Sequence, residues 1–229
     1  MAPVNVLAIE TSTELCSAAV LRGSELFVEE TVAANRHSEL LVPMVQRLLE
    51  RSRLAVAQMN AIAFGQGPGS FTGIRIACGM AQGLAFGAER PVVPVPSLLA
   101  LAEQSNESRV IAAFDARMDE AYLAAYARSG DDWQEVIAPC LVDRAALPSL
   151  PGRGWVATGS GFDRFDWLRT HYRDSIALRL ENDLPRAGSI ARVAARRMAR
   201  GESVAAEQAA PLYLRDKVAL TTEERQARR

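Results

Sequence analysis

Residues 6–20 read Val-Leu-Ala-Ile-Glu-Thr-Ser-Thr-Glu-Leu-Cys-Ser-Ala-Ala-Val. An apolar run ends at Ile9, a polar turn follows, and a second apolar run begins at Cys16. This pattern predicts two strands joined by a short connection, to which residues 26–31 can add a third. The chain is therefore expected to begin with a hairpin-led sheet.

The same scheme recurs in the second half of the chain. Residues 110–126 read Val-Ile-Ala-Ala-Phe-Asp-Ala-Arg-Met-Asp-Glu-Ala-Tyr-Leu-Ala-Ala-Tyr, so that Asp115 corresponds to Glu10 and Asp119 to Glu14. Chance similarity between two hairpins is the alternative to a true repeat. Two matched halves explain the pattern more economically, and they predict an α/β fold of two duplicated subdomains, each a mixed sheet led by a β-hairpin with flanking helices.

The polar run at residues 105–108 is the clearest linker. We therefore expect an N-terminal subdomain at residues 1–105 and a C-terminal subdomain at residues 106–218. The charged residues 219–229 are expected to form a flexible tail.

A glycine-rich loop precedes the longest apolar helix pattern. Residues 65–79 read Gly-Gln-Gly-Pro-Gly-Ser-Phe-Thr-Gly-Ile-Arg-Ile-Ala-Cys-Gly. Gly67, Gly69 and Ser70 can present backbone N–H groups at a helix start, which favours an anion cradle. A tight turn that lets a strand and a helix pack closely is the alternative. The spacing matches neither the P-loop nor the dinucleotide-binding fingerprint.

Two helix patterns carry candidate contact surfaces. Residues 37–52 have the three-four apolar spacing of an amphipathic helix, and residues 72–87 carry Gly79, Gly83 and Gly87 at intervals of four. Each helical glycine costs roughly 1 kcal/mol relative to alanine, so three on one face need a compensating close approach. The approaching surface is either another subunit or the chain's own sheet.

Composition narrows the function classes. A net charge of −1 gives no overall attraction to nucleic acid. The five arginines between residues 186 and 200 can either grip phosphate or form a solvated helix face. The three cysteines, Cys16, Cys78 and Cys140, are far apart and lack metal spacing, and no stretch reaches the length of a membrane span. These features favour a cytoplasmic protein.

Four motifs support a family resemblance. They are Leu-Ala-Ile-Glu-Thr-Ser-Thr at 7–13, His-Ser-Glu-Leu-Leu-Val-Pro-Met-Val at 37–45, Gly-Gln-Gly-Pro-Gly-Ser-Phe-Thr-Gly-Ile-Arg-Ile at 65–76 and Pro-Leu-Tyr-Leu-Arg at 211–215. In these motifs the chain resembles the TsaB family, also called YeaZ, of the actin, sugar kinase and Hsp70 superfamily. The resemblance implies actin-like (ribonuclease H-like) subdomains. It also implies a subunit of the bacterial complex that makes N6-threonylcarbamoyladenosine next to the anticodon of tRNAs.

The resemblance implies that the chain itself has no catalytic residue and no metal site. Catalytic relatives bind a metal through two histidines, and Ser97 and Leu101 occupy those positions here. The two histidines present, His37 and His171, lie in different halves. Nucleotide binds in the cleft of the superfamily, so the candidate nucleotide or anion residues are Glu10, Thr11, Ser12, Gly67, Gly69 and Ser70. No cofactor is firmly expected, although ATP or ADP could bind at the subunit junction of the assembled complex.

The expected partners are TsaD, which performs the transfer, and TsaE, which supplies ATPase activity. The chain is expected to self-dimerise when alone and to meet tRNA only indirectly through the complex, without membrane contact. The predicted partner interface consists of His37, Leu40, Leu41, Met44, Ile76, Gly79, Met80, Gly83 and Leu84.

Two enzyme interpretations compete with the binding subunit. An ATP-dependent kinase of the sugar-kinase and actin superfamily would use Glu10 or Asp115 to hold magnesium, and it predicts saturable ATP binding by the isolated chain. A peptidase would need a base beside Ser70 or a set of metal ligands, and the sequence presents neither.

Overall fold

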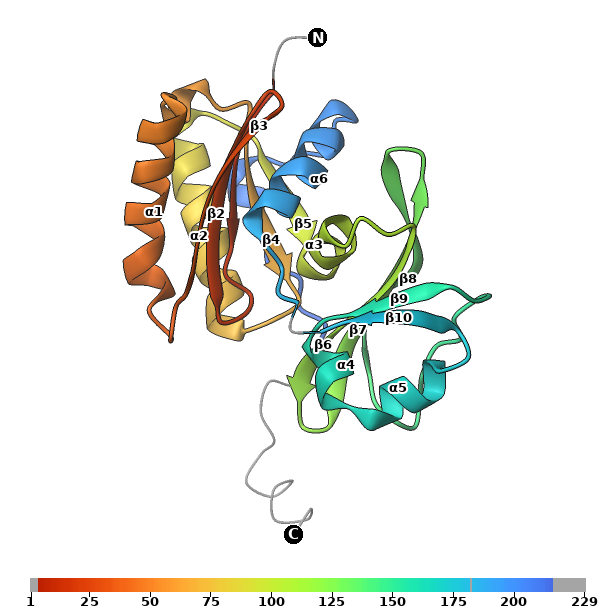
Figure 1. The fold of residues 1–229 in the computed structure, drawn as a ribbon. Helices are drawn as coiled ribbons and strands as arrows, with labels where there is room; N and C mark the ends of the chain where they lie inside the picture. Colours follow the sequence, from red (N-terminus) through yellow and green to blue (C-terminus); the bar gives the residue numbers. More distant parts are fainter. Residues whose placement is uncertain (1–3, 182, 216–229) are drawn as a thin grey trace.

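The structure, a computed structural model, describes residues 4–181 and 183–215, and the predicted tail at 219–229 lies outside them. The first half of the chain builds a five-stranded sheet in the order β3-β2-β1-β4-β5 (Figure 1). Its strands are β1 (Asn5–Glu10), β2 (Leu15–Arg22), β3 (Glu25–Val32), β4 (Ala61–Gly67) and β5 (Val92–Pro96). The first three strands pair antiparallel, whereas β1, β4 and β5 run parallel.

The second half repeats this sheet. Its order is β10-β9-β6-β7-β8, with antiparallel pairing from β6 to β8 and parallel pairing from β6 through β9 to β10. The strands are β6 (Arg109–Arg117), β7 (Glu120–Ser129), β8 (Asp132–Val142), β9 (Trp155–Thr158) and β10 (Ile176–Leu180). Read from β8 to β10, the order and strand directions equal those of the first sheet, so the predicted duplicated α/β fold is confirmed.

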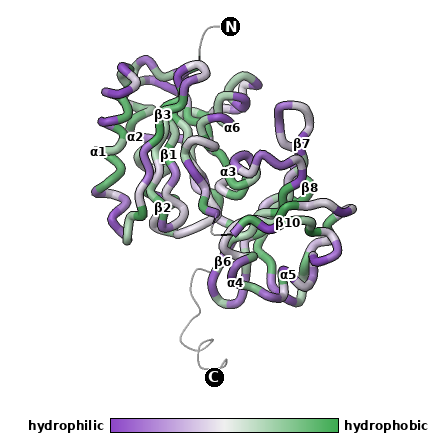
Figure 2. Tube along the Cα trace, viewed as in Figure 1, coloured by the Kyte–Doolittle hydropathy of each residue, from purple (hydrophilic) through white to green (hydrophobic). Residues whose placement is uncertain are grey.

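Helices cover the outer face of each sheet (Figure 1). Helices α1 (His37–Ser52) and α2 (Phe71–Ala88) pack on the first sheet around Leu48, Ile62 and Phe64. Figure 2 shows hydrophilic and hydrophobic stretches alternating along α1, as an amphipathic helix requires. The short helices α4 (Ser160–Arg164) and α5 (Asp166–Tyr172) cover the second sheet.

Residues 160–172 form two short helices, α4 and α5, in place of one continuous helix. Phe165 separates them in an extended conformation, with φ −109° and ψ 111°. Its ring is buried among the core residues of the second half. Burial of that ring therefore outweighs the local helix pattern.

The inner faces of both sheets share one core. Helices α3 (Ser97–Gln104) and α6 (Ala187–Ala199) lie between the two halves, where their apolar side chains pack with Val6 and Ala63 of the first sheet and Val110 and Tyr126 of the second. We expected α6 to belong to the second subdomain, and its position corrects that division. It packs across β1 and β2, and Ala187 N donates to Ser17 Oγ at 2.9 Å. Its buried stripe fits the apolar face that the first sheet leaves uncovered.

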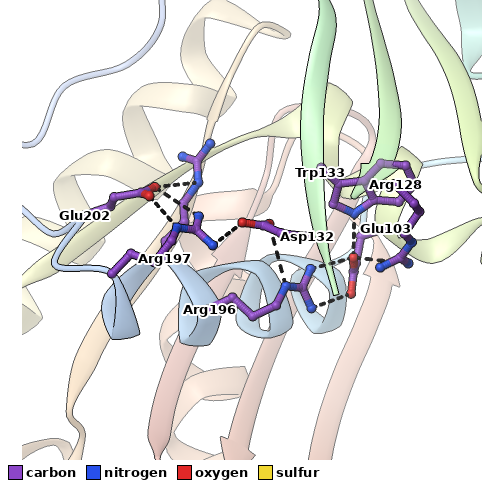
Figure 3. Close-up of polar contacts among 8 residues, drawn as sticks. Glu103, Arg128, Asp132, Trp133, Arg196, Arg197 and Glu202 are labelled. Atoms are coloured by element: carbon purple, nitrogen blue, oxygen red, sulfur yellow. Dashed lines mark hydrogen bonds and ion pairs between the residues drawn. The ribbon is translucent and has the colours of Figure 1, made fainter. Parts of the chain in front are cut away.

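The arginines of α6 hold this arrangement in place (Figure 3). Arg196 pairs with Glu103 of α3 and with Asp132 of β8, and Arg200 also pairs with Asp132. Arg197 donates to Pro94 O at 2.8 Å and pairs with Glu202, while Arg186, just before the helix, pairs with Glu30. Four of the five arginines in this run thus make contacts within the chain, and the fifth, Arg192, is exposed.

Candidate functional site

The acidic residue at the end of β1 lies in a sealed environment. Glu10 is completely buried, and its two oxygens accept from Ser12 N at 2.6 Å and Ser97 Oγ at 2.7 Å. It rests on Gly65 of β4, where an added Cβ would lie 1.9 Å from Glu10 Oε2. Burial raises the pKa of Glu10, against the smaller lowering effect of these hydrogen bonds. Glu10 therefore has hydrogen-bond partners inside the chain and no contact with solvent.

The glycine loop packs directly on the turn after Glu10. Ser70 N donates to Ser12 O at 2.7 Å, and Thr11 Oγ1 donates to Gly73 O at 2.7 Å. A Cβ at Gly69 would lie 2.5 Å from Ser12 O, and one at Gly73 would lie 1.9 Å from Thr11 O. These glycines are needed because two backbone segments meet there without room for a side chain.

The six candidate nucleotide residues are thus brought together from two segments, Glu10–Ser12 and Gly67–Ser70. The Ser70 hydroxyl caps α2 by accepting from Gly73 N at 3.3 Å. A hollow of about 70 Å³ beside the loop is lined by Pro68, Ile74 and Leu212, among others. Ligand pockets usually measure about 300–1,000 Å³, so this hollow is smaller than a usual ligand pocket. Nucleotide binding at these residues stays a prediction for the assembled complex.

Ser97 and Leu101, the two positions at which we expected no metal-binding histidine, have side chains that pack inside the chain. Ser97 is buried against Glu10, and Leu101 lies in the shared core. The Nε2 atom of His37 lies 2.9 Å from Thr13 O, while the ring of His171 stacks edge-on against Tyr172. Among residues 4–181 and 183–215, no group of three or more His, Cys, Asp or Glu side chains is arranged to hold a metal.

The glycine line of α2 faces open space. A Cβ added at Gly79, Gly83 or Gly87 meets no atom within 4 Å. Beside this line lie half-buried apolar side chains that pack on the first-half core and keep one side uncovered: Leu40, Ile76, Met80 and Leu84. Six of the nine predicted interface residues therefore contribute to one accessible surface, which we call the α2 face: Leu40, Ile76, Gly79, Met80, Gly83 and Leu84.

The other three predicted interface residues are not on this surface. Leu41 and Met44 are 1% and 2% exposed and pack in the core beneath α1. His37 is 8% exposed, with its ring turned toward the Thr13 carbonyl. Placing Leu41 and Met44 at a contact surface was wrong, because both lie on the stripe of α1 that the first sheet covers.

Two exposed apolar side chains lie outside the predicted interface set. Phe86 is 77% exposed beside Gly87, and Val42 of α1 is 45% exposed. Phe86 also borders a shallow hollow of about 600 Å³ with Pro91, Val204 and Ala206. Phe86 sits three residues after Gly83, so an exposed aromatic at that spacing was a signal available in the sequence.

No helix in the described part of the chain is long and apolar enough to cross a membrane.

The chain is similar to known proteins in both sequence and structure. Residues 28–222 match the family model described as TsaD: tRNA N6-adenosine threonylcarbamoyltransferase. The chain is 37% identical to the tRNA threonylcarbamoyladenosine biosynthesis protein TsaB of Escherichia coli, over 94% of this chain and 96% of that one. It is 34% identical to TsaB of Haemophilus influenzae, over 95% and 96% of the two chains. The solved structure of YeaZ from Pseudomonas aeruginosa superimposes with a TM-score of 0.81 and 36% identity, covering 92% of this chain and all of that one.

Proposed function

The chain belongs to the TsaB family, and on that premise we propose that it is a non-catalytic subunit that binds and supports TsaD. As a TsaB protein it takes part in the biosynthesis of threonylcarbamoyladenosine in tRNA. Its contribution is a docking surface, the α2 face, and the threonylcarbamoyl transfer itself takes place on TsaD. TsaE, which joins the assembled complex, and a cytoplasmic location belong to the same proposal.

The observation that carries the proposal is the composition of α2. Of the 18 residues in this helix only Arg75 is charged, yet Gly79, Gly83 and Gly87 are exposed. A helix that is apolar on nearly all sides is normally buried, and glycines without neighbours let another backbone approach closely. A matching helix of a partner would supply the missing packing, and a second copy of the chain can take that place when TsaD is absent.

The interior supports a non-catalytic role. Glu10 is closed in by Ser12, Gly65 and Ser97, so it cannot reach a magnesium ion or a substrate without disrupting those contacts. The kinase alternative is therefore not favoured. Titration of the isolated chain with magnesium-ATP tests this point, and we expect no saturable binding. A nucleotide at the junction with TsaD would bind only after assembly.

Gly83→Glu tests the docking surface. The side chain points into open space, so the isolated variant should fold, while a charge in an apolar contact should abolish co-purification with TsaD. The matched control is Leu178→Glu, which places the same charge at a 49%-exposed apolar position on β10. Co-purification of Gly83→Glu at the wild-type yield would contradict the proposal.

A further inference from the structure

The chain has an exposed aromatic and arginine cluster that the docking surface does not explain. Phe71 and Arg75 lie in the first turns of α2. Tyr213 lies near the end of the described residues, 138 positions after Arg75 in the chain. The rings of Phe71 and Tyr213 are 43% and 49% exposed, with centroids 6.2 Å apart.

Arg75 joins the two rings. Its guanidinium carbon lies 3.3 Å from the centre of the Phe71 ring and 5.3 Å from that of Tyr213. The Nε atom donates to Tyr213 Oη at 2.8 Å. These contacts hold the guanidinium plane and one ring together at the surface and leave the terminal amino groups available to a ligand.

The charge of Arg75 is not neutralised by a carboxylate within the described residues. By contrast Arg215, which lines the same hollow as Phe71 and Tyr213, pairs with Glu120. Since the chain as a whole is slightly acidic, this unpaired cation between two exposed rings is a local feature that favours an anionic ligand with flat groups.

We propose that Phe71, Arg75 and Tyr213 bind unpaired bases of RNA, the rings by stacking and Arg75 by contact with phosphate. The inference rests on the proposed function, because it assigns the RNA to the tRNA on which the complex acts. Proteins recognise single-stranded RNA loops by stacking bases on aromatic rings and guanidinium planes. The arginine run near the end of the chain does not offer such a surface, because four of its five guanidinium groups are paired internally.

The position of the cluster fits this role. Arg75 precedes Gly79 by one helical turn, so the cluster lies at the edge of the α2 face. RNA held by a partner on that face would pass beside the two rings. The exposed sides of the two rings, next to the adjoining hollow, are where the bases stack.

The test uses the assembled complex of this chain with TsaD and a fluorescent RNA hairpin that carries the anticodon stem and loop. We expect Phe71→Ala and Tyr213→Ala each to weaken RNA binding roughly five- to hundred-fold, as removal of a stacking ring does. Phe71→Tyr keeps a ring and should restore the affinity. Arg75→Gln should reduce the salt dependence of binding by about 0.7 in log–log slope, the value for one phosphate contact in a single strand.

Matched controls are Leu178→Ala and Arg192→Gln, an exposed apolar residue and an exposed arginine outside the cluster. A hairpin with 4-thiouridine in its loop should cross-link to Phe71 or Tyr213 in the wild-type complex. Unchanged RNA affinity in both alanine variants, with the complex intact, would overturn the inference and leave the proposed function standing. Loss of TsaD from the alanine variants would also overturn it, because the cluster would then be a protein contact. Failure of the wild-type chain to bind TsaD would instead contradict the proposed function.

Discussion

Arg196 and Glu103 form a two-pronged ion pair at the junction of the two halves, with Nη2 2.7 Å from Oε2 and Nη1 3.1 Å from Oε1. Trp133 Nε1 donates to the same carboxylate at 2.8 Å, and Glu103 is 7% exposed (Figure 3). This carboxylate ties α3 to α6 and to β8. The halves of the chain are therefore held together by charge as well as by the shared apolar core.

Glu103→Ala should lower the free energy of unfolding by about 3–5 kcal/mol, because it leaves Arg196 largely buried without its main partner. Urea denaturation of the isolated chain measures the effect. Arg36→Ala removes an exposed pair with Glu39 and is the control, with an expected loss below about 1 kcal/mol. Equal losses in the two variants would contradict a structural role for the Glu103 cluster.

Glu10 should make stability depend on pH in the direction opposite to most carboxylates. Burial raises the pKa of Glu10 in the folded chain, so the folded state binds the proton more tightly than the unfolded state. Its contribution to stability is present below the unfolded pKa and is lost as pH rises through the folded pKa.

In Glu10→Gln the amide can donate to Ser97 Oγ while its oxygen accepts from Ser12 N, as the protonated carboxyl would. The variant should match the wild type near pH 4 and become relatively more stable as pH rises to 8. Urea denaturation across this range tests it. A constant difference between the two proteins would mean that Glu10 titrates alike in both states.

Gly83→Ala should raise the stability of the isolated chain and lower its affinity for TsaD. The added methyl meets nothing within 4 Å, and alanine in place of a helical glycine adds about 0.5–1 kcal/mol of stability. Thermal unfolding should shift upward while the affinity for TsaD falls. A variant with raised stability and unchanged affinity would show that the partner does not approach α2 closely at this position.

Gly73→Ala should behave oppositely to Gly79→Ala, although both lie in α2. The new methyl at Gly73 would lie 1.9 Å from Thr11 O, a backbone atom that cannot move without disturbing the turn after β1. We expect a loss of at least about 2 kcal/mol in the free energy of unfolding, by overpacking. Gly79→Ala should be neutral or stabilising. Similar behaviour of the two variants would contradict the close packing of the glycine loop.

Much of the architecture was predictable because its signals are local. Alternating apolar residues marked the strands, the three-four spacing marked α1 over its exact observed length of His37–Ser52, and the recurrence of the Glu10 pattern at Asp115 predicted the second sheet. The meeting of the first turn with the glycine loop was not predicted, and it results from the parallel pairing of β1 with β4, in which Ile9 lies opposite Phe64.

Local sequence patterns were not enough to predict the burial of Leu41, the conformation of Phe165 or the position of α6. Leu40 and Leu41 both fall within the apolar arc of α1, so the amphipathic pattern alone does not tell which of the two side chains is exposed. The position of the covering sheet decides it. Phe165 leaves the helix conformation because a core position takes its ring.

The sequence by itself determined most of the secondary structure, the duplication and the family, because each depends mainly on the order and spacing of residues along the chain. Tertiary structure alone decided that α6 returns to the first sheet, that Glu10 is sealed, and that Phe71, Arg75 and Tyr213 meet at the surface. These features depend on how the packed layers meet in space, and contacts between segments far apart in the chain leave no periodic trace in either segment.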